Sequence, residues 1–116
     1  MGRLSTHVLD TVHGRPASGV RIELLRVRDG GADFLATATT NADGRTDEPL
    51  LSGDSLTTGK YRLLFHVADY FRSVGIEDAG EFLDIVPVEF IVIDASATYH
   101  VPLLVSPWHY VTYRGS

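Results

Sequence analysis

Apolar and polar residues alternate with a period of two in several stretches of this 116-residue chain. Val20, Ile22 and Leu24 alternate with charged residues, and residues 61–67 repeat the pattern with larger side chains. Successive side chains of an extended strand point to opposite faces, so this spacing predicts strands that bury one face in a core. The pattern therefore predicts a chain built mainly from β-strands.

Further stretches extend this pattern towards the C-terminus. Residues 35–40, 85–93 and 99–105 are rich in apolar and β-branched side chains, and residues 111–113 are long enough to close a sheet. Only residues 68–74 fit a helix, which Gly75 would end. Strands at short, regular spacing with one helical segment predict an all-β fold, an antiparallel β-sandwich of two sheets and about eight strands. We expect one domain over residues 1–116.

Composition and charge narrow the possible chemistry. The chain has 15 acidic and 10 basic side chains, a net charge of −5, and no cysteine. A net negative charge argues against nucleic-acid partners, and the lack of cysteine excludes disulfides, thiol nucleophiles and thiolate metal sites. No apolar run approaches the length of a membrane span, and no charged-then-apolar leader precedes the first strand-like segment. We therefore expect a cytoplasmic protein with no membrane partner.

The late strands are apolar on both faces. Even-numbered residues of the stretch 85–93 form one apolar face, yet Pro87, Ile91 and Ile93 on the other face are apolar as well. The outer face of an isolated two-layer sandwich should be polar. This pattern predicts that a second copy of the chain covers the outer face, with burial under loops as the alternative.

Two short motifs resemble known sites but lack the required context. Residues 53–56 spell the Gly-Asp-Ser-Leu nucleophile block of one lipase and esterase family, with an Asp-x-x-His at residues 10–13. That family places its Asp-x-x-His downstream of the serine, so we expect residues 53–56 to form a solvated loop. Residues 41–44 resemble part of a calcium loop, but carboxylates are missing at both ends of the loop. We expect a turn there and no metal site.

Histidine is the side chain best suited to proton transfer here, because its pKa lies near neutrality. We predict structural or surface positions for His13, His66 and His109. His7 and His100 lie within strand-like segments, and His100 shares its face with the apolar residues at 102 and 104. Spacing alone leaves both a functional and a structural role open for His100.

Four segments together point to a known family. They are Leu-Ser-Thr-His-Val-Leu-Asp-Thr at 4–11 followed by Gly-Arg-Pro-Ala, Thr-Asn-Ala-Asp-Gly-Arg-Thr at 40–46, Tyr-His-Val-Pro-Leu-Leu-Val-Ser-Pro at 99–107, and Tyr-Arg-Gly-Ser at 113–116. The chain resembles, over almost its whole length, the hydrolases of the transthyretin-like family. The final tetrapeptide separates these hydrolases from the hormone carrier of the same fold.

The resemblance implies a transthyretin-like sandwich that opens the ring of 5-hydroxyisourate to 2-oxo-4-hydroxy-4-carboxy-5-ureidoimidazoline, a step of urate degradation in purine catabolism. Water attacks a cyclic amide carbonyl in this reaction, and the family uses no metal or cofactor. The family resemblance also implies a homotetramer, a dimer of dimers, with each site in a cleft between subunits.

The resemblance further implies two overlapping sets of site residues. The expected catalytic residues are His7, Arg45, His100 and Ser116. The expected substrate-binding residues are His7, Arg45, Tyr113, Arg114 and Gly115. We expect the imidazoles to move protons and the guanidinium to stabilise the developing oxyanion. Which histidine acts as the base stays open.

Two other functions are compatible with parts of the pattern. A transthyretin-like carrier would bind a small molecule without hydrolysis. An immunoglobulin-like interaction domain would share the sandwich, but it usually has a Cys…Trp…Cys core, and here the one tryptophan is Trp108. Thr98 and the Trp108-His109 pair depart from the hydrolase pattern, which leaves the local shape at the mouth of the site open.

Overall fold

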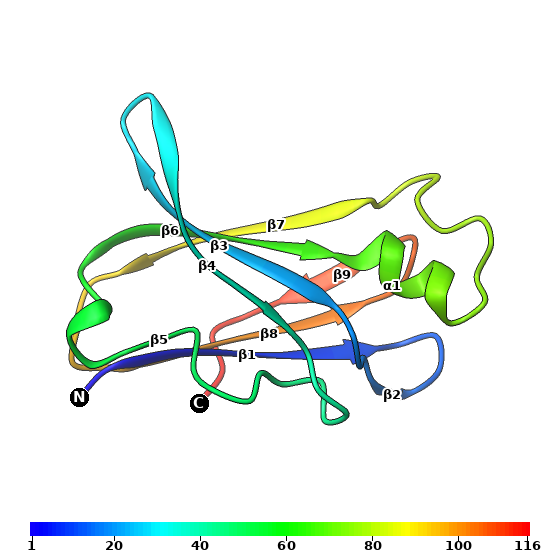
Figure 1. Cartoon of the computed structure of the whole chain (residues 1–116), viewed down its shortest axis with the longest axis horizontal. Coiled ribbons are helices and arrows are strands. Elements are labelled where there is room, and N and C mark those ends of the chain that lie inside the picture. Colours follow the sequence, from blue (N-terminus) through cyan, green and yellow to red (C-terminus); the bar gives the residue numbers. More distant parts are fainter.

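The computed structural model describes residues 1–116, which form two facing β-sheets and one α-helix (Figure 1). The first sheet has the order β2-β1-β8-β9, with β5 also paired to β1. Its strands are β1 (Arg3–Asp10), β2 (Arg15–Pro16), β5 (Leu51–Ser52), β8 (Thr98–Val105) and β9 (Tyr110–Thr112). The second sheet, in the order β4-β3-β6-β7, contains β4 (Gly31–Thr39), β3 (Arg21–Arg28), β6 (Gly59–His66) and β7 (Ile85–Val92). The predicted two-sheet sandwich is confirmed.

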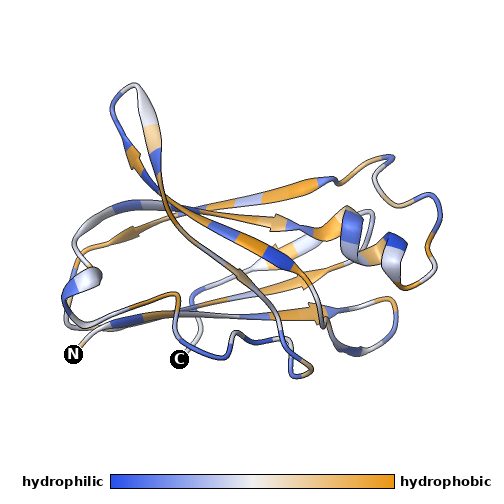
Figure 2. Ribbon diagram, in the orientation of Figure 1, coloured by the Kyte–Doolittle hydropathy of each residue, from blue (hydrophilic) through white to orange (hydrophobic).

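The core lies between the two sheets and follows the predicted alternation. Hydrophobic residues, drawn in orange in Figure 2, occur along the strands of both sheets. In β8, Tyr99, Val101 and Leu103 are buried against the opposite sheet, whereas His100 is half-buried on the outer face. The hydrophobic core contains 22 buried residues drawn from both sheets, the helix and the connecting segments. The outer face of β8 is therefore left for other functions.

One strand pairing departs from the expected antiparallel arrangement. β1 and β8 run parallel, in a register that places Ser5 beside His100 and Thr6 beside Val101. All other strand pairs are antiparallel. A parallel pair needs a long crossover, and here the chain forms the whole second sheet between the two strands. Because β1 pairs with β8, segments from the two ends of the chain lie side by side in the first sheet.

Several elements differ from the sequence prediction in length. β4 begins at Gly31 instead of residue 35, because a two-residue turn joins it to β3 in a projecting hairpin (Figure 1). The helix α1 (Val67–Ser73) lies within one residue of the expected range. The two-residue strands β2 and β5 were not predicted, since two residues are too short to show periodicity. The helix lacks the length and apolar character that crossing a membrane requires.

The first three residues of the Gly-Asp-Ser-Leu motif form a turn at the surface, whereas Leu56, expected in the same solvated loop, is 2% exposed and packs in the core. Residues Gly53–Ser55 make one turn of 3-10 helix. The hydroxyl of Ser55 donates to the carbonyl of Ser52 and accepts from the amide of Ser52. The serine side chain therefore closes its own turn, as expected for a solvated loop.

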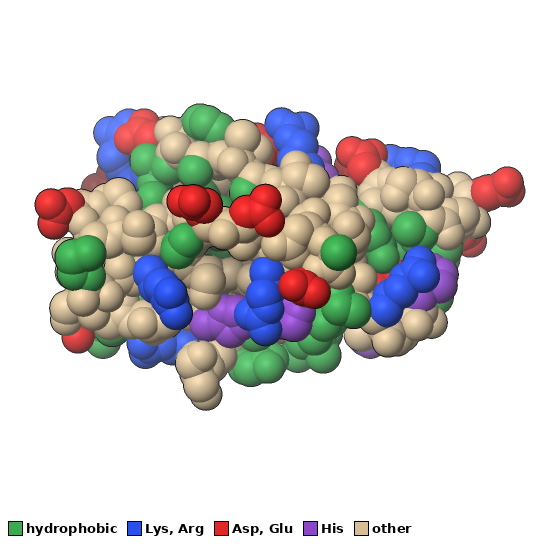
Figure 3. All heavy atoms as spheres, turned by 60° about the horizontal axis from the view of Figure 1, so that its bottom comes forward, with side chains coloured by type: hydrophobic (Ala, Val, Ile, Leu, Met, Phe, Trp, Pro, Cys, Tyr) green, Lys and Arg blue, Asp and Glu red, His purple; other side chains and the backbone are tan.

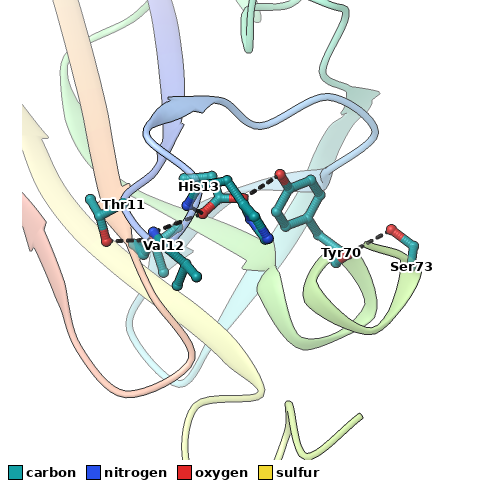
Figure 4. A network of polar contacts seen from close by, with 7 residues as sticks. Thr11, Val12, His13, Tyr70 and Ser73 are labelled. Atoms are coloured by element: carbon teal, nitrogen blue, oxygen red, sulfur yellow. Dashed lines mark hydrogen bonds and ion pairs between the residues drawn. The ribbon is translucent and has the colours of Figure 1, made fainter. Parts of the chain in front are cut away.

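A network of polar contacts joins Tyr70 of the helix to His13 and Val12 just after β1 (Figure 4). Asp10 is 1% exposed and accepts hydrogen bonds from the amides of Val12 and His13, from the His13 ring and from the Tyr70 hydroxyl at 2.7 Å. Burial opposes ionisation, but the hydrogen bonds from Tyr70 and His13 outweigh it and hold the pKa of Asp10 below its usual value. Burial, together with the bond to Asp10, raises the pKa of Tyr70 to about 12.

Removing the Tyr70 hydroxyl should destabilise the fold. Tyr70→Phe takes one donor from a buried carboxylate, and a hydrogen bond to a charged group contributes about 1.5–3 kcal/mol to the free energy of unfolding. The loss should fade as the pH falls through the lowered pKa of Asp10, because the protonated acid needs fewer donors. Denaturant unfolding at equal protein concentration measures it, with Tyr110→Phe as the exposed-tyrosine control. Equal stability of the two variants would contradict the prediction.

Candidate active site

The outer face of the first sheet carries a group of histidine and arginine side chains. Ser5 and His7 lie on this face of β1, and His100 lies beside Ser5 on β8. All three are half-buried. Figure 3 turns the lower side of Figure 1 towards the reader and shows histidines lying among basic side chains there. His100 therefore lies on the predicted outer face, and this face also carries Ser5 and His7 of β1.

A tight turn brings Arg45 to this face. The Asn41 side chain accepts hydrogen bonds from the amides of Asp43 and Arg45, which forms the predicted turn. Gly44 is buried with φ +75, and its carbonyl accepts a hydrogen bond from the amide of Val8 at 2.8 Å. A Cβ atom at Gly44 would lie 2.4 Å from the carbonyl oxygen of Val8. Glycine thus allows the turn to approach β1 closely enough to place Arg45 near His7.

The same turn fixes the protonation of one imidazole nitrogen. Nε2 of His7 lies 2.9 Å from the carbonyl oxygen of Asp43. A carbonyl oxygen can only accept, so Nε2 of His7 carries the hydrogen and donates it. Nδ1 of His7 is then the nitrogen left to exchange a proton.

His100 is bound through its other nitrogen. Its Nδ1 lies 2.9 Å from the hydroxyl oxygen of Ser5, which leaves Nε2 without a protein partner. Burial lowers the pKa of His100, and the positive charges of Arg45 and His7 lower it further. His100 is therefore neutral at pH 7. Ser5, which is hydrogen-bonded to His100, and Arg45 line one cavity, so Arg45 lies on the same face as the imidazole.

The C-terminal segment returns to the start of β8. The amide of Gly115 donates to the carbonyl of His100 at 2.7 Å. A Cβ atom at Gly115 would lie 2.6 Å from Cδ2 of the His100 ring, so only glycine fits against the imidazole edge. The Arg114 guanidinium stacks 4.2 Å from the Tyr99 ring centroid and donates to the carbonyl of Thr98 at 3.1 Å. The segment is therefore held against the imidazole of His100.

The structure brings together four of the residues expected at the site, His7, Arg45, His100 and Gly115. The Arg114 guanidinium is engaged in anchoring the segment, and its role in substrate binding stays a prediction. Tyr113 is 57% exposed and lines a groove of about 360 Å³ beside β7, and Ser116 is exposed beyond Gly115. The roles of both residues also stay predictions.

The sequence interpretation missed Ser5 and the cavity beside it. A polar cavity of about 220 Å³ adjoins the site; its lining comprises Arg3, Ser5, Thr6, Arg45, Thr46 and Pro49. Ser5 precedes His7 by two residues, so the period of the strand already places both on one face. Its pairing with His100 becomes visible only with the register of β1 and β8. No three histidine or carboxylate side chains are placed to hold a metal ion.

Comparison with known proteins agrees with this architecture. Residues 4–115 match the model of the HIUase/Transthyretin family. The chain is 52% identical, over 99% of its length and 97% of the relative, to 5-hydroxyisourate hydrolase 2 of Rhizobium meliloti (strain 1021). The solved 5-hydroxyisourate hydrolase of Klebsiella pneumoniae superposes with a TM-score of 0.81 at 34% identity, covering 100% of both chains.

A second solved structure contains the same unit within a longer chain. (S)-Allantoin synthase superposes with a TM-score of 0.91 at 44% identity over 99% of this chain, which spans only 44% of that longer chain. The family match covers nearly every residue, and the curated hydrolase is aligned over almost its full length. The chain therefore belongs to the HIUase/Transthyretin family.

Proposed function

We propose that this single-domain protein is a hydrolase that opens the ring of 5-hydroxyisourate to 2-oxo-4-hydroxy-4-carboxy-5-ureidoimidazoline, a step of urate degradation in purine catabolism. The relatives named above support the reaction class. The observation that carries the proposal is the placement of a neutral imidazole, His100, beside Arg45 and His7 on one face. The cytoplasmic location stays a prediction.

Proton transfer is the first task of such a site. Water is a poor nucleophile at neutral pH, so a base must take its proton while the oxygen attacks the carbonyl carbon. His100 is neutral at pH 7 because its pKa is lowered, and it is the base in this proposal. A positioned base of this kind contributes about 10²–10⁴-fold to the rate. Nδ1 of His7 has no protein partner, and when it is protonated it can give that proton to the leaving ring nitrogen. The proton that His100 takes from water then restores the starting protonation of the site.

Charge stabilisation is the second task. The attacked carbonyl oxygen becomes an oxyanion, and a fixed cation close to it lowers the barrier. Arg45 is exposed at the end of a tight turn, so its planar donor fork is free to bind the oxygens of a urate-like ring. Collapse of the tetrahedral intermediate then breaks the cyclic amide bond and leaves a ring nitrogen that has taken up a proton and a carboxylic acid, which gives its proton to solvent. The hydrolysis consumes only water.

The proposed enzyme is a homotetramer, a dimer of dimers, with sites between subunits. Ile91, on the outer side of β7, is 58% exposed, and Ile93, just beyond the end of β7, is 80% exposed. The two-sided apolar pattern predicts such exposure for a chain that meets another copy. Val111 is likewise exposed on β9. Light scattering of the purified protein tests the assembly.

The direct test of the function uses freshly generated 5-hydroxyisourate. Its ultraviolet absorbance should decay faster with the protein than without it, in proportion to protein concentration. A carrier would bind the compound and leave its spontaneous decay unaccelerated. That outcome, with a folded protein, would rule out the hydrolase and favour the carrier.

The rate should depend on the ionisation of His100. A base must be unprotonated, so kcat/KM should fall as the pH drops through the pKa of His100 in the free enzyme. Burial and the neighbouring charges lower this pKa, so the acid limb should lie below 6.5, the ordinary value for histidine. A pH–rate profile measures the limb, and an NMR titration of the His100 ring assigns it. An acid limb at or above the ordinary value would contradict the assignment.

A further inference from the structure

The His100 ring makes one hydrogen bond, and its partner, Ser5, lies outside the expected catalytic set. Ser5 and His100 are direct partners in the parallel β1–β8 ladder, and both side chains lie on the outer face. The Ser5 hydroxyl oxygen is 2.9 Å from Nδ1 of His100. This short distance between residues 95 positions apart in sequence is set by the strand register.

The direction of this hydrogen bond decides what His100 can do. A neutral imidazole has one N–H and one nitrogen lone pair, and the lowered pKa keeps His100 neutral. Ser5 occupies Nδ1, so Nε2 is the only ring nitrogen that can take a proton from water. Nε2 has a free lone pair only when Nδ1 carries the hydrogen and donates it to the Ser5 oxygen.

The surroundings of both groups are compatible with this direction. The Ser5 hydroxyl makes no second hydrogen bond within the protein and lines the polar cavity of about 220 Å³, so its own hydrogen can point to water there. On the other side of the ring, Gly115 lies against Cδ2, the carbon next to Nε2. The imidazole is therefore held between a hydroxyl on one edge and a glycine on the other.

We infer that Ser5 is a positioning residue that accepts a hydrogen bond from Nδ1–H of His100 and so presents the Nε2 lone pair to the attacking water. This inference rests on the proposed function, because it assumes that His100 is the base. Ser5 acts only through the imidazole.

The matched variants are Ser5→Ala, which removes the hydroxyl, and Ser5→Thr, which keeps it. Ser5→Ala should lower kcat about 10- to 100-fold, the range seen when the partner orienting a metal-bound histidine is removed, with little change in KM. Ser5→Thr should retain most of the wild-type kcat. Ser96→Ala, which removes a hydroxyl bonded only to Asp94, should match the wild type. Circular dichroism and thermal unfolding check that all three variants fold.

A second measurement reads the ring directly and needs no substrate. Nitrogen-15 NMR of the His100 ring, at a pH above its pKa, should show the hydrogen on Nδ1 in the wild type and a shift towards Nε2–H in Ser5→Ala. A wild-type hydrogen on Nε2, an unchanged kcat in Ser5→Ala, or an equal loss in Ser5→Thr would each overturn the role of Ser5. Failure of the wild type to hydrolyse 5-hydroxyisourate would instead overturn the proposed function, while the NMR result still reports the tautomer.

Discussion

Deletion of residues 113–116 is expected to abolish turnover of 5-hydroxyisourate while the β-rich circular dichroism spectrum is retained. The last strand, β9, ends at Thr112, and none of the four deleted residues belongs to the hydrophobic core. Their contacts lie at the site: Gly115 donates to the His100 carbonyl, and Arg114 stacks on Tyr99. The deletion should therefore expose the imidazole without unfolding the sandwich. The ultraviolet decay assay and thermal unfolding measure the two properties separately.

A narrower change separates the position of the segment from its presence. Gly115→Ala keeps every other group of the tail, but its Cβ atom would lie 2.6 Å from Cδ2 of His100 and force the ring or the tail to move. It should lose activity as well. Turnover at the wild-type rate in the deletion variant would remove the tail from the mechanism.

His100→Ala should lower kcat by about 10²–10⁴-fold, because the water then lacks a positioned base. Arg45→Ala should cost about 10²–10³-fold, the range for loss of an oxyanion donor. Both side chains lie on the outer face of the first sheet or on the turn beside it, and neither is in the hydrophobic core, so the fold should survive. Steady-state kinetics with freshly generated substrate gives both values.

A histidine on the other sheet provides the matched control. Nε2 of His66 is 2.5 Å from the Glu23 carboxylate on the outer face of the second sheet. His66→Gln keeps a hydrogen-bond donor there and should leave kcat within about twofold of the wild type. Near-full activity in His100→Ala, or a loss in His66→Gln as large as in His100→Ala, would withdraw the assignment of His100 as the base.

Much of the fold could be predicted from the sequence because strand alternation is a local property. The expected stretches 85–93 and 99–105 each lie within one residue of β7 and β8. The short strands β2 and β5 could not be found, since two paired residues have no period of their own.

Residue patterns predicted less of the site than of the fold, because the site depends on contacts between segments that are distant in the sequence. Alternation placed His100 on the outer face, but only the resemblance to the family joined it to His7 and Arg45. The parallel register of β1 and β8 was not expected, and it is this register that pairs Ser5 with His100. Spacing within one strand cannot reveal which residue lies opposite on a strand distant in the sequence.

The parallel β1–β8 ladder also makes catalysis a sensitive reporter of strand alignment. Thr6 is 1% exposed, and its hydroxyl donates to the carbonyl of Val101 at 2.7 Å, which locks the two strands together from inside the sandwich. A slip of a single residue would turn Thr6 outward and bury Ser5 and His7, since neighbouring side chains of a strand face opposite ways. Substitutions that remove the hydrogen bond between Thr6 and Val101 should therefore lower turnover under conditions in which the protein is still folded. Loss of turnover would then report misaligned strands before unfolding is detected.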